Sequence, residues 1–336
     1  MVVSFGLVIV LGLIGALVKV PYVAIGPGPT TNTLGKVGNT DVVSIDGTQV
    51  HQPNGQLRMT TVSLTDSVTL FGALGLWLSG SEALAPREEY YQPGQTDQQV
   101  EQQNVEQFQQ SQSSAEISAL RYLHYPMRAL AKDVTVGGPS DKIIKPGDQF
   151  IDVNGTTIND ELDVRSALTH TTPGQTVPVT LRTGNDAPRT VHIKLGKNTQ
   201  DTSQKQGFLG ITTTDKAQVP FTIKINVPDV GGPSAGLMFA LTIIDKLTDD
   251  DLAGGKTVAG TGEIDEVGDV APIGGIPFKL IAARDAGATV FLVPADNCAE
   301  AKSKVPAGLQ LVKVASLDAA VHDLQDLKAG KQVPSC

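Results

Sequence analysis

The first apolar segment of the chain covers residues 2–18 and carries no charged residue. Lys19, Pro21 and a Gly-Pro-Gly-Pro loop at 26–29 follow it and indicate where a helix would end. An apolar run of this length lies near the lower limit for crossing a bilayer as a helix. The pattern therefore predicts a single-pass membrane anchor over residues 1–20, with a secretory signal and a buried core helix as the alternatives.

Short apolar segments separated by turns come next and predict strands at 41–47 and 56–62. Gln, Glu and Ser then dominate residues 88–121. A thin apolar stripe in this stretch favours an exposed helix packed along one edge, and a flexible polar linker is the alternative. The stripe consists of Val100, Val105, Phe108, Ile117 and Leu120. We expect residues 21–124 to form an N-terminal region outside the membrane, with this helix as an insertion.

Residues 125–196 have the alternation of a small β-rich domain. The pattern predicts, in order, a strand at 149–153, an Asn-Gly turn at 154–155, a short helix near 162–168, and strands at 177–182 and 190–195. Here the chain resembles a PDZ domain of the bacterial type, on its Pro-Gly-Asp and Val-Asn-Gly segments, its helix and its closing strands. The resemblance implies capture of an extended peptide, with a carboxylate-binding loop near 125–136. A purely structural spacer is the alternative.

The third region, residues 207–336, alternates strands, glycine-rich turns and apolar helices. The pattern predicts strands at 221–227, 257–264 and 267–271, and helices at 237–247 and 278–287. Together with the earlier segments, this indicates an α+β fold.

Composition and charge exclude several classes of protein. The chain has 336 residues, 40% hydrophobic, which excludes wholesale disorder. A formal net charge of −9 and 4% aromatic residues argue against nucleic acid as a partner. The only two cysteines, Cys298 and Cys336, exclude a disulfide-dense scaffold and a cysteine-based zinc site. A disulfide between them and two independent thiols both remain open.

Ser234 is the candidate nucleophile. It lies in a Gly-Gly-Pro-Ser-Ala-Gly segment at 231–236, between a predicted strand and a predicted helix. Glycines permit close backbone approach, and the free N–H groups of a helix start can stabilise an oxyanion. A serine at such a junction can equally be a plain helix cap.

A nucleophilic serine needs a base, and Lys279 is the candidate. None of the five histidines lies in a motif-like context, and four of them precede residue 207. Lys279 stands among apolar residues in the first turns of a predicted helix, where a positive charge is disfavoured. A lysine base must lose about 3 pKa units through burial or positive neighbours. A lysine on the surface is the alternative.

No cofactor is expected. The nearest match to a phosphate-binding loop, at 255–257, has Asp250 where the first glycine is required. The three aspartates at 249–251 are expected to form a solvated turn, so no metal site is predicted.

Three segments of the third region occur together in the Lon (S16) serine peptidases, whose proteolytic domain this region resembles. They are Gly-Pro-Ser-Ala-Gly at 232–236, Thr-Gly-Glu-Ile at 261–264 and the Pro-Ile-Gly-Gly segment that leads into Lys279. The resemblance implies a Ser234–Lys279 dyad, with the Lys279 amine oriented by Thr261. It also implies an oxyanion hole formed by the backbone N–H groups of Ser234 and Gly232.

The whole layout resembles the membrane-anchored YlbL-type PDZ/Lon-like proteases of Gram-positive bacteria, with features closest to the actinobacterial branch. The resemblance implies an ATP-independent serine endopeptidase in the cell membrane, with its catalytic part extracytoplasmic. Its expected partners are peptides or unfolded protein segments. Lon-type domains tend to form rings, so a homo-oligomer is also implied. The main alternative is an anchored PDZ scaffold with an inert Lon-like domain, and the second is a chain that matures by cleaving itself.

Overall fold

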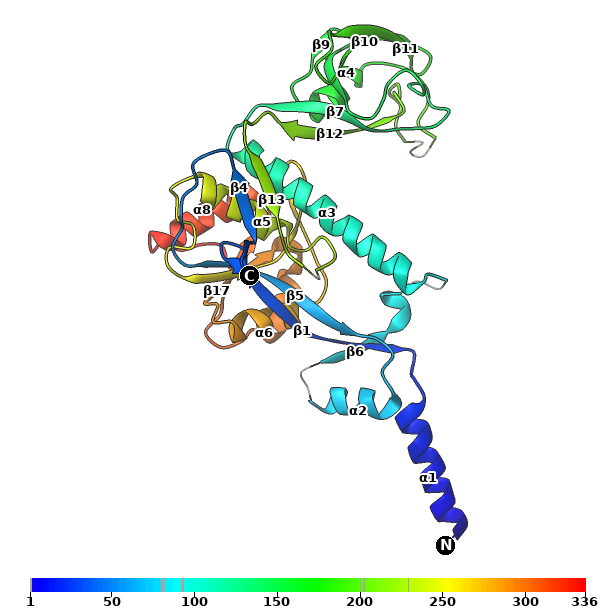
Figure 1. Cartoon of the computed structure of the whole chain (residues 1–336), viewed down its shortest axis with the longest axis vertical. Helices are drawn as coiled ribbons and strands as arrows, with labels where there is room; N and C mark the ends of the chain where they lie inside the picture. The colour runs from blue at the N-terminus through cyan, green and yellow to red at the C-terminus, as the bar shows by residue number, and fades with distance from the viewer. Residues whose placement is uncertain (1, 80–81, 92–93, 200, 202, 229) are drawn as a thin grey trace. The chain divides into compact units, whose positions relative to one another are not determined.

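The computed structural model describes residues 2–336 except 80–81, 92–93, 200, 202 and 229. It divides into two compact units, one made of Met1–Tyr122 with Phe221–Cys336, and the other of Leu123–Pro220 (Figure 1). The second unit is thus inserted into the chain of the first. This differs from the predicted division at 21–124, 125–196 and 207–336, because the N-terminal and C-terminal regions fold together.

One mixed sheet joins these two regions in the first unit. Its strand order is β18-β17-β14-β5-β1-β6. The strands are β1 (Tyr22–Asn32), β5 (Gln56–Thr65), β6 (Ala83–Pro86), β14 (Thr257–Gly260), β17 (Val290–Pro294) and β18 (Gln310–Val314). The central strand β14 pairs in parallel with β5 and β17, whereas β1 pairs antiparallel with β5 and β6. All residues of β17 are buried, which explains its uninterrupted apolar sequence.

The helices of this unit that bear on the site or pack beside it are α3 (Asp97–Tyr122), α5 (Gly236–Leu247), α6 (Ile276–Asp285) and α8 (Leu317–Lys328). Helix α5 is buried along nearly its whole length, which explains why most of its residues are apolar. It contacts α3, α8 and β5, while α6 contacts β1 and β5 (Figure 1). Both α5 and α6 therefore begin close to the middle of the sheet.

The remaining elements of the first unit are short. They are β2 (Lys36–Val37), β3 (Thr40–Asp41), β4 (Val43–Asp46), β13 (Thr222–Ile225), β15 (Glu263–Ile264), β16 (Val270–Ala271), α2 (Leu70–Ser79), α7 (Cys298–Ala301) and the 3-10 turns Arg87–Glu89, Ala295–Asn297 and Lys302–Lys304. Strand β13 pairs with β4. A disulfide joins Cys298 at the start of α7 to Cys336, so the pairing left open by the sequence is present.

The inserted unit is a sheet with one short helix. Its strands are β7 (Met127–Val134), β8 (Asp148–Val153), β9 (Thr156–Thr157), β10 (Thr176–Thr183), β11 (Arg189–Lys194) and β12 (Ile211–Ala217), and its helix is α4 (Glu161–Leu168). The strand order is β11-β10-β8-β7-β12, with β9 on β8. The unit has its own buried core, which includes Phe150, Val179 and Ile193.

Two expectations for this part of the chain are corrected. The predicted carboxylate-binding loop near 125–136 is mostly strand β7, which pairs with β12. Residues 207–220, predicted to open the third region, lie in the inserted unit instead. Their polar alternation hid a strand whose partner lies about eighty residues earlier in the chain, at Met127–Val134.

The N-terminal helix is shorter than the predicted anchor. Helix α1 spans Val2–Leu17, which is 16 residues, and residue 1 of the prediction lies outside the described residues. A helix needs about 20 apolar residues to cross a bilayer. Within the described part of the chain, no helix is both long enough and apolar enough to do so, and the predicted single-pass anchor is therefore not borne out.

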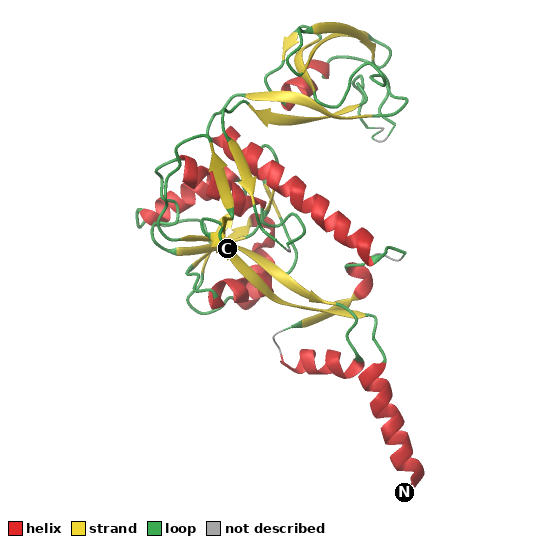
Figure 2. Ribbon diagram, viewed as in Figure 1, coloured by secondary structure: helices red, strands yellow, loops and turns green. Residues whose placement is uncertain are grey.

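Both units combine helices with strands, as Figure 2 shows. The mixed helix and strand content expected from the sequence is thus confirmed.

Candidate active site

Three separate elements bring Ser234, Thr261 and Lys279 together. Ser234 lies in the turn before α5, Thr261 directly follows β14, and Lys279 lies in the first turns of α6. The backbone of the Ser234 turn is fixed to the end of β14, because the Gly262 N–H donates to the Ser234 carbonyl at 2.8 Å. The sheet therefore sets the distance between the start of α5 and the start of α6.

The amine of Lys279 lies between two hydroxyls. Its Nζ donates to Oγ of Ser234 at 2.7 Å and to Oγ1 of Thr261 at 2.8 Å. The Thr261 hydroxyl in turn donates its hydrogen to the Ser234 carbonyl at 2.9 Å. Because that hydrogen is engaged, the Thr261 oxygen acts as an acceptor for the amine. When the amine is neutral, one of its N–H groups can stay on Thr261 while its lone pair accepts the Ser234 hydroxyl proton.

Burial sets the charge state of Lys279. The residue is only 1% exposed, and this loss of solvation lowers the pKa of its amine from 10.5 to about 7. About half of the molecules then carry a neutral lysine near neutral pH. The alternative of a surface lysine is wrong for this position.

Ser234 does not cap α5. The N-cap of that helix is Ala235, and it makes no side-chain capping bond. Ser234 is half-buried, and its Oγ faces the Lys279 amine instead of the helix N–H groups. The turn before α5 therefore directs the Ser234 hydroxyl to the Lys279 amine and not to the N–H groups of the helix.

The backbone N–H groups beside Ser234 differ in availability. The Gly232 N–H, predicted to face an oxyanion, donates to the Asn104 carbonyl at 3.0 Å and is thus engaged in this structure. The Ser234 N–H makes no hydrogen bond to any described residue. This N–H is therefore one donor of the turn that can bind a ligand.

A cleft of about 400 Å³ leads to the dyad. Most of its wall is apolar, which suits a segment of polypeptide with apolar side chains. It is lined by Ile25, Pro29, Thr61, Val62, Leu64, Tyr90, Asn104, Val230, Gly231, Ser234, Gly274, Gly275 and Lys279.

Sequence reasoning missed two residues of α3 that reach this site, Asn104 and Ser111. Ser111 is 3% exposed, and its Oγ donates to the Pro233 carbonyl at 2.9 Å. Val105 was predicted to belong to the apolar stripe of this helix, but its side chain is 45% exposed. Small polar residues at helical spacing were the missed signal, since Ser111, Ser114 and Ser118 are all buried on this face.

Among the described residues, no group of three or more His, Cys, Asp or Glu side chains could hold a metal ion.

Two known protein families match the chain. Residues 210–325 match the Lon protease (S16) C-terminal proteolytic domain, and residues 101–195 match the PDZ domain. The first match contains Ser234, Thr261 and Lys279, and the second includes most of α3 as well as much of the inserted unit.

Curated relatives point to the same protease class. The Lon protease of Azospirillum brasilense is 40% identical over 103 residues, which cover 29% of this chain and 12% of that protein. The Lon protease of Rickettsia typhi is 35% identical over 119 residues, which cover 33% of this chain and 15% of that protein. The chain thus spans 12–15% of the length of these relatives. These matches support a serine protease of the S16 class, and their sources lend nothing to the predicted actinobacterial origin.

Solved structures are similar to part of this chain. The PDZ domain of an SdrC-like protein from Listeria monocytogenes is 20% identical, covers 25% of this chain and 85% of that one, and has a TM-score of 0.23.

Proposed function

We propose that this chain, which carries a Lon-type proteolytic domain and a PDZ domain, is an ATP-independent serine endopeptidase with a Ser234–Lys279 dyad. The proposal depends mainly on one observation. A buried lysine with a pKa of about 7 lies 2.7 Å from the serine hydroxyl and 2.8 Å from an orienting threonine. A nucleophile, a base and an orienting group at hydrogen-bond distance form the arrangement that acyl transfer requires.

In the first step, the neutral Lys279 amine removes the Ser234 hydroxyl proton as Oγ attacks the scissile carbonyl carbon. The new bond places a negative charge on the carbonyl oxygen, which the Ser234 N–H stabilises. The Gly232 N–H, the second donor implied by the resemblance, stays bonded to the Asn104 carbonyl in this structure.

In the second step, the tetrahedral intermediate collapses and the peptide C–N bond breaks. The protonated Lys279 gives its proton to the leaving amine, so the amine departs neutral and the base is restored. Water then attacks the acyl-enzyme carbonyl as Lys279 accepts the water proton. Lys279 returns this proton to the departing Oγ as the ester C–O bond breaks, which releases free Ser234 and an acid product that ionises to a carboxylate.

Substrate choice follows from the cleft and from the inserted unit. A 400 Å³ cleft admits an extended segment but not a folded domain. PDZ domains bind extended peptides by strand addition, which suits the capture or sensing of protein tails. We expect peptides or unfolded segments as substrates, without ATP, since the 336 residues contain no phosphate-binding loop.

An extracytoplasmic location is part of this proposal. The support is the Cys298–Cys336 disulfide, because disulfides persist in oxidising compartments and are rare in the cytosol. A homo-oligomer remains a prediction from sequence.

The test is hydrolysis of unstructured peptides without nucleotide by the wild type, Ser234→Ala and Lys279→Ala. We expect both variants to lose activity by at least about 10³-fold while keeping the wild-type melting temperature within a few degrees. Wild-type activity that needs ATP would contradict the nucleotide independence. A folded wild type that cleaves nothing, with peptide binding to residues 123–220 intact, would leave a binding scaffold in place of an enzyme.

A further inference from the structure

Helix α3 holds two of the three peptide groups between Gly231 and Ser234. The Asn104 carbonyl accepts the Gly232 N–H at 3.0 Å. The Ser111 hydroxyl donates to the Pro233 carbonyl at 2.9 Å. Helix α3 lies outside the three Lon-like segments, yet it bonds both a backbone N–H and a backbone carbonyl of the turn that carries Ser234.

Helix α3 is itself firmly attached to the first unit, and it runs beside α5 in Figure 1. Phe108 is 6% exposed and packs edge-on against Phe239 of α5, with ring centroids 5.9 Å apart. At the C-terminal end of α3, Nε of Arg121 donates to the Glu266 carbonyl at 3.1 Å. Because α3 is held at its middle and at its end, it can keep the turn before Ser234 in a fixed position.

Two glycines make this approach possible. A Cβ on Gly231 would come within 2.8 Å of the Asn104 Cβ, and one on Gly236 within 2.9 Å of the Ser111 oxygen. Gly231 has no left-handed backbone conformation. Glycine at position 231 therefore permits the close contact with α3 and is not needed for an unusual φ angle.

We propose that Ser111 is a positioning residue for the Ser234 nucleophile, with the Asn104 carbonyl as the second anchor of the same turn. The two bonds fix the turn so that Ser234 lines the cleft, with its Oγ 2.7 Å from the Lys279 amine. Ser111 touches neither substrate nor the reacting atoms, so it acts only through the turn. This inference rests on the proposed peptidase function.

The first test compares Ser111→Ala with a matched variant, Ser118→Ala. Ser118 is also buried on α3, at 2% exposure, but its hydroxyl donates to Ala115 of its own helix at 3.2 Å. We expect Ser111→Ala to lower kcat roughly 10–100-fold, the range for a nucleophile displaced by about 1 Å, with KM within about twofold. Ser118→Ala should keep the wild-type kcat.

The pH profile separates positioning from a general loss of structure. The surroundings of the Lys279 amine do not include Ser111, so the Ser111→Ala profile should keep its midpoint near pH 7 while its plateau falls. A kcat equal to that of Ser118→Ala, a rise in kcat, or a fall confined to KM would each overturn the proposal.

The second test uses the steric contact between Gly231 and Asn104. Gly231→Ala should push the turn off α3 and lower kcat roughly tenfold or more. Adding Asn104→Gly removes the Cβ that the new methyl meets and should restore most of that loss. Adding Asn104→Ala keeps this Cβ and should restore nothing. Equal restoration by the two second-site changes, or by neither, would contradict a role for this contact.

These outcomes separate the inference from the function that it assumes. If the wild type does not cleave peptides and a fluorophosphonate does not label its Ser234, the peptidase function fails. If the wild type is active and Ser111→Ala matches Ser118→Ala, only the positioning role fails.

Discussion

Lys279 combines a long cationic side chain with almost complete burial. Burial removes hydration from the charged form, which lowers the pKa of the amine to about 7. Its only polar contacts among the described residues are the hydroxyls of Ser234 and Thr261. Neither hydroxyl neutralises a charge, so the site favours the neutral amine that a base requires.

This burial opposes folding, so an apolar replacement should stabilise the protein. With a pKa of about 7 folded and 10.5 unfolded, the unfolded chain binds more protons between those pH values, and stability rises with pH across that window. Below pH 7 the full cost applies, on the order of 5 kcal/mol from 1.36 kcal/mol per unit. Lys279→Met should therefore be more stable than the wild type in urea unfolding at pH 6, and the gain should shrink at pH 9. A destabilised variant at pH 6 would contradict the buried amine.

The contribution of Thr261 to the peptidase activity should come from its hydroxyl alone. Thr261→Val keeps the shape but removes the acceptor for the amine and the donor to the Ser234 carbonyl. We expect kcat to fall roughly 10–100-fold, as for the loss of an orienting bond. Thr261→Ser keeps the hydroxyl and should retain activity within about threefold. Equal losses in the two variants would point to packing and not to orientation.

The sequence predicted the residues of the dyad but not the side chains around it. Ser234, Thr261 and Lys279 lie in short segments whose glycines and spacing resemble a known family. Asn104 and Ser111 lie in a Gln-rich helix more than 120 residues before Ser234, and they reach it only through the packing of α3 on α5. No local pattern encodes a contact between such distant segments.

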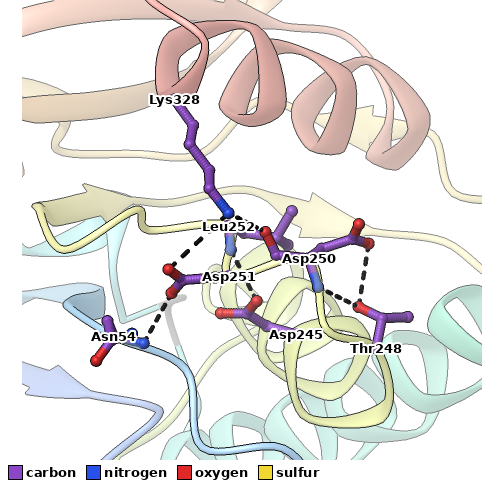
Figure 3. Close-up of polar contacts among 7 residues, drawn as sticks. All are labelled: Asn54, Asp245, Thr248, Asp250, Asp251, Leu252 and Lys328. Atoms are coloured by element: carbon purple, nitrogen blue, oxygen red, sulfur yellow. Dashed lines mark hydrogen bonds and ion pairs between the residues drawn. The ribbon is translucent and has the colours of Figure 1, made fainter.

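At the scale of elements, α5 places its two ends in different environments. Its first turn follows Ser234, whereas its last turn holds the buried carboxyl of Asp245 (Figure 3). Oδ1 of Asp245 accepts the Leu252 N–H at 2.8 Å, and Oδ2 has no hydrogen-bond partner among the described residues. Burial, and to a smaller extent the nearby Asp251 and Asp250 carboxylates, raise the pKa of Asp245 to about 6, although the Leu252 N–H and Lys328 oppose this rise.

Asp245 should therefore make stability fall as pH rises from about 4 to 6. In that window the folded chain holds a proton that the unfolded chain, with a pKa of 3.8, has lost. The shift of about 2 units corresponds to roughly 3 kcal/mol. Asp245→Asn keeps an oxygen for Leu252 but does not titrate. Between pH 4 and 7, urea unfolding should show the wild type losing roughly 3 kcal/mol more stability than this variant. Parallel stability profiles would contradict a buried proton.

The elements themselves were largely predictable. Apolar periodicity indicated the long helix in 88–121, seen as α3, and the strand-to-helix order around Ser234, seen as β13 and α5. The errors arose where a pattern was polar or the partner was remote. A loop was predicted at β7 because the PDZ resemblance implied one there, and β12, at the edge of the sheet, pairs with β7 about eighty residues away.

At the scale of the whole molecule, the first unit is discontinuous in sequence. Strands β1 and β5 come from the N-terminal third of the chain, yet β5 pairs directly with β14, next to the site. Sequence reasoning placed them in a separate region, because parallel pairing across some 200 residues leaves no local signal.

The inserted unit should be removable. Its two connections to the first unit lie side by side, because the Gln218 N–H donates to the Pro126 carbonyl at 2.8 Å and Met127 pairs with Ala217. Replacing residues 127–217 by a short glycine-rich turn should leave a folded first unit. We expect that variant to cleave short peptides with kcat within about threefold of the wild type, since all residues of the dyad and its cleft lie outside 127–217.

An excised protein that unfolds, or that folds and loses short-peptide cleavage, would contradict this independence. The isolated segment 123–220 is the matched control, and its buried core should let it fold alone with a cooperative thermal transition.

The central claim is that a neutral, buried Lys279 activates Ser234. The most direct measurement is the rate at which a fluorophosphonate modifies Ser234, followed by mass spectrometry from pH 5 to 9. The account predicts a rate that rises with pH through a single midpoint near 7, and that is lost in Lys279→Ala while the variant stays folded. A rate that does not depend on pH in this range, or that survives in folded Lys279→Ala, would contradict it.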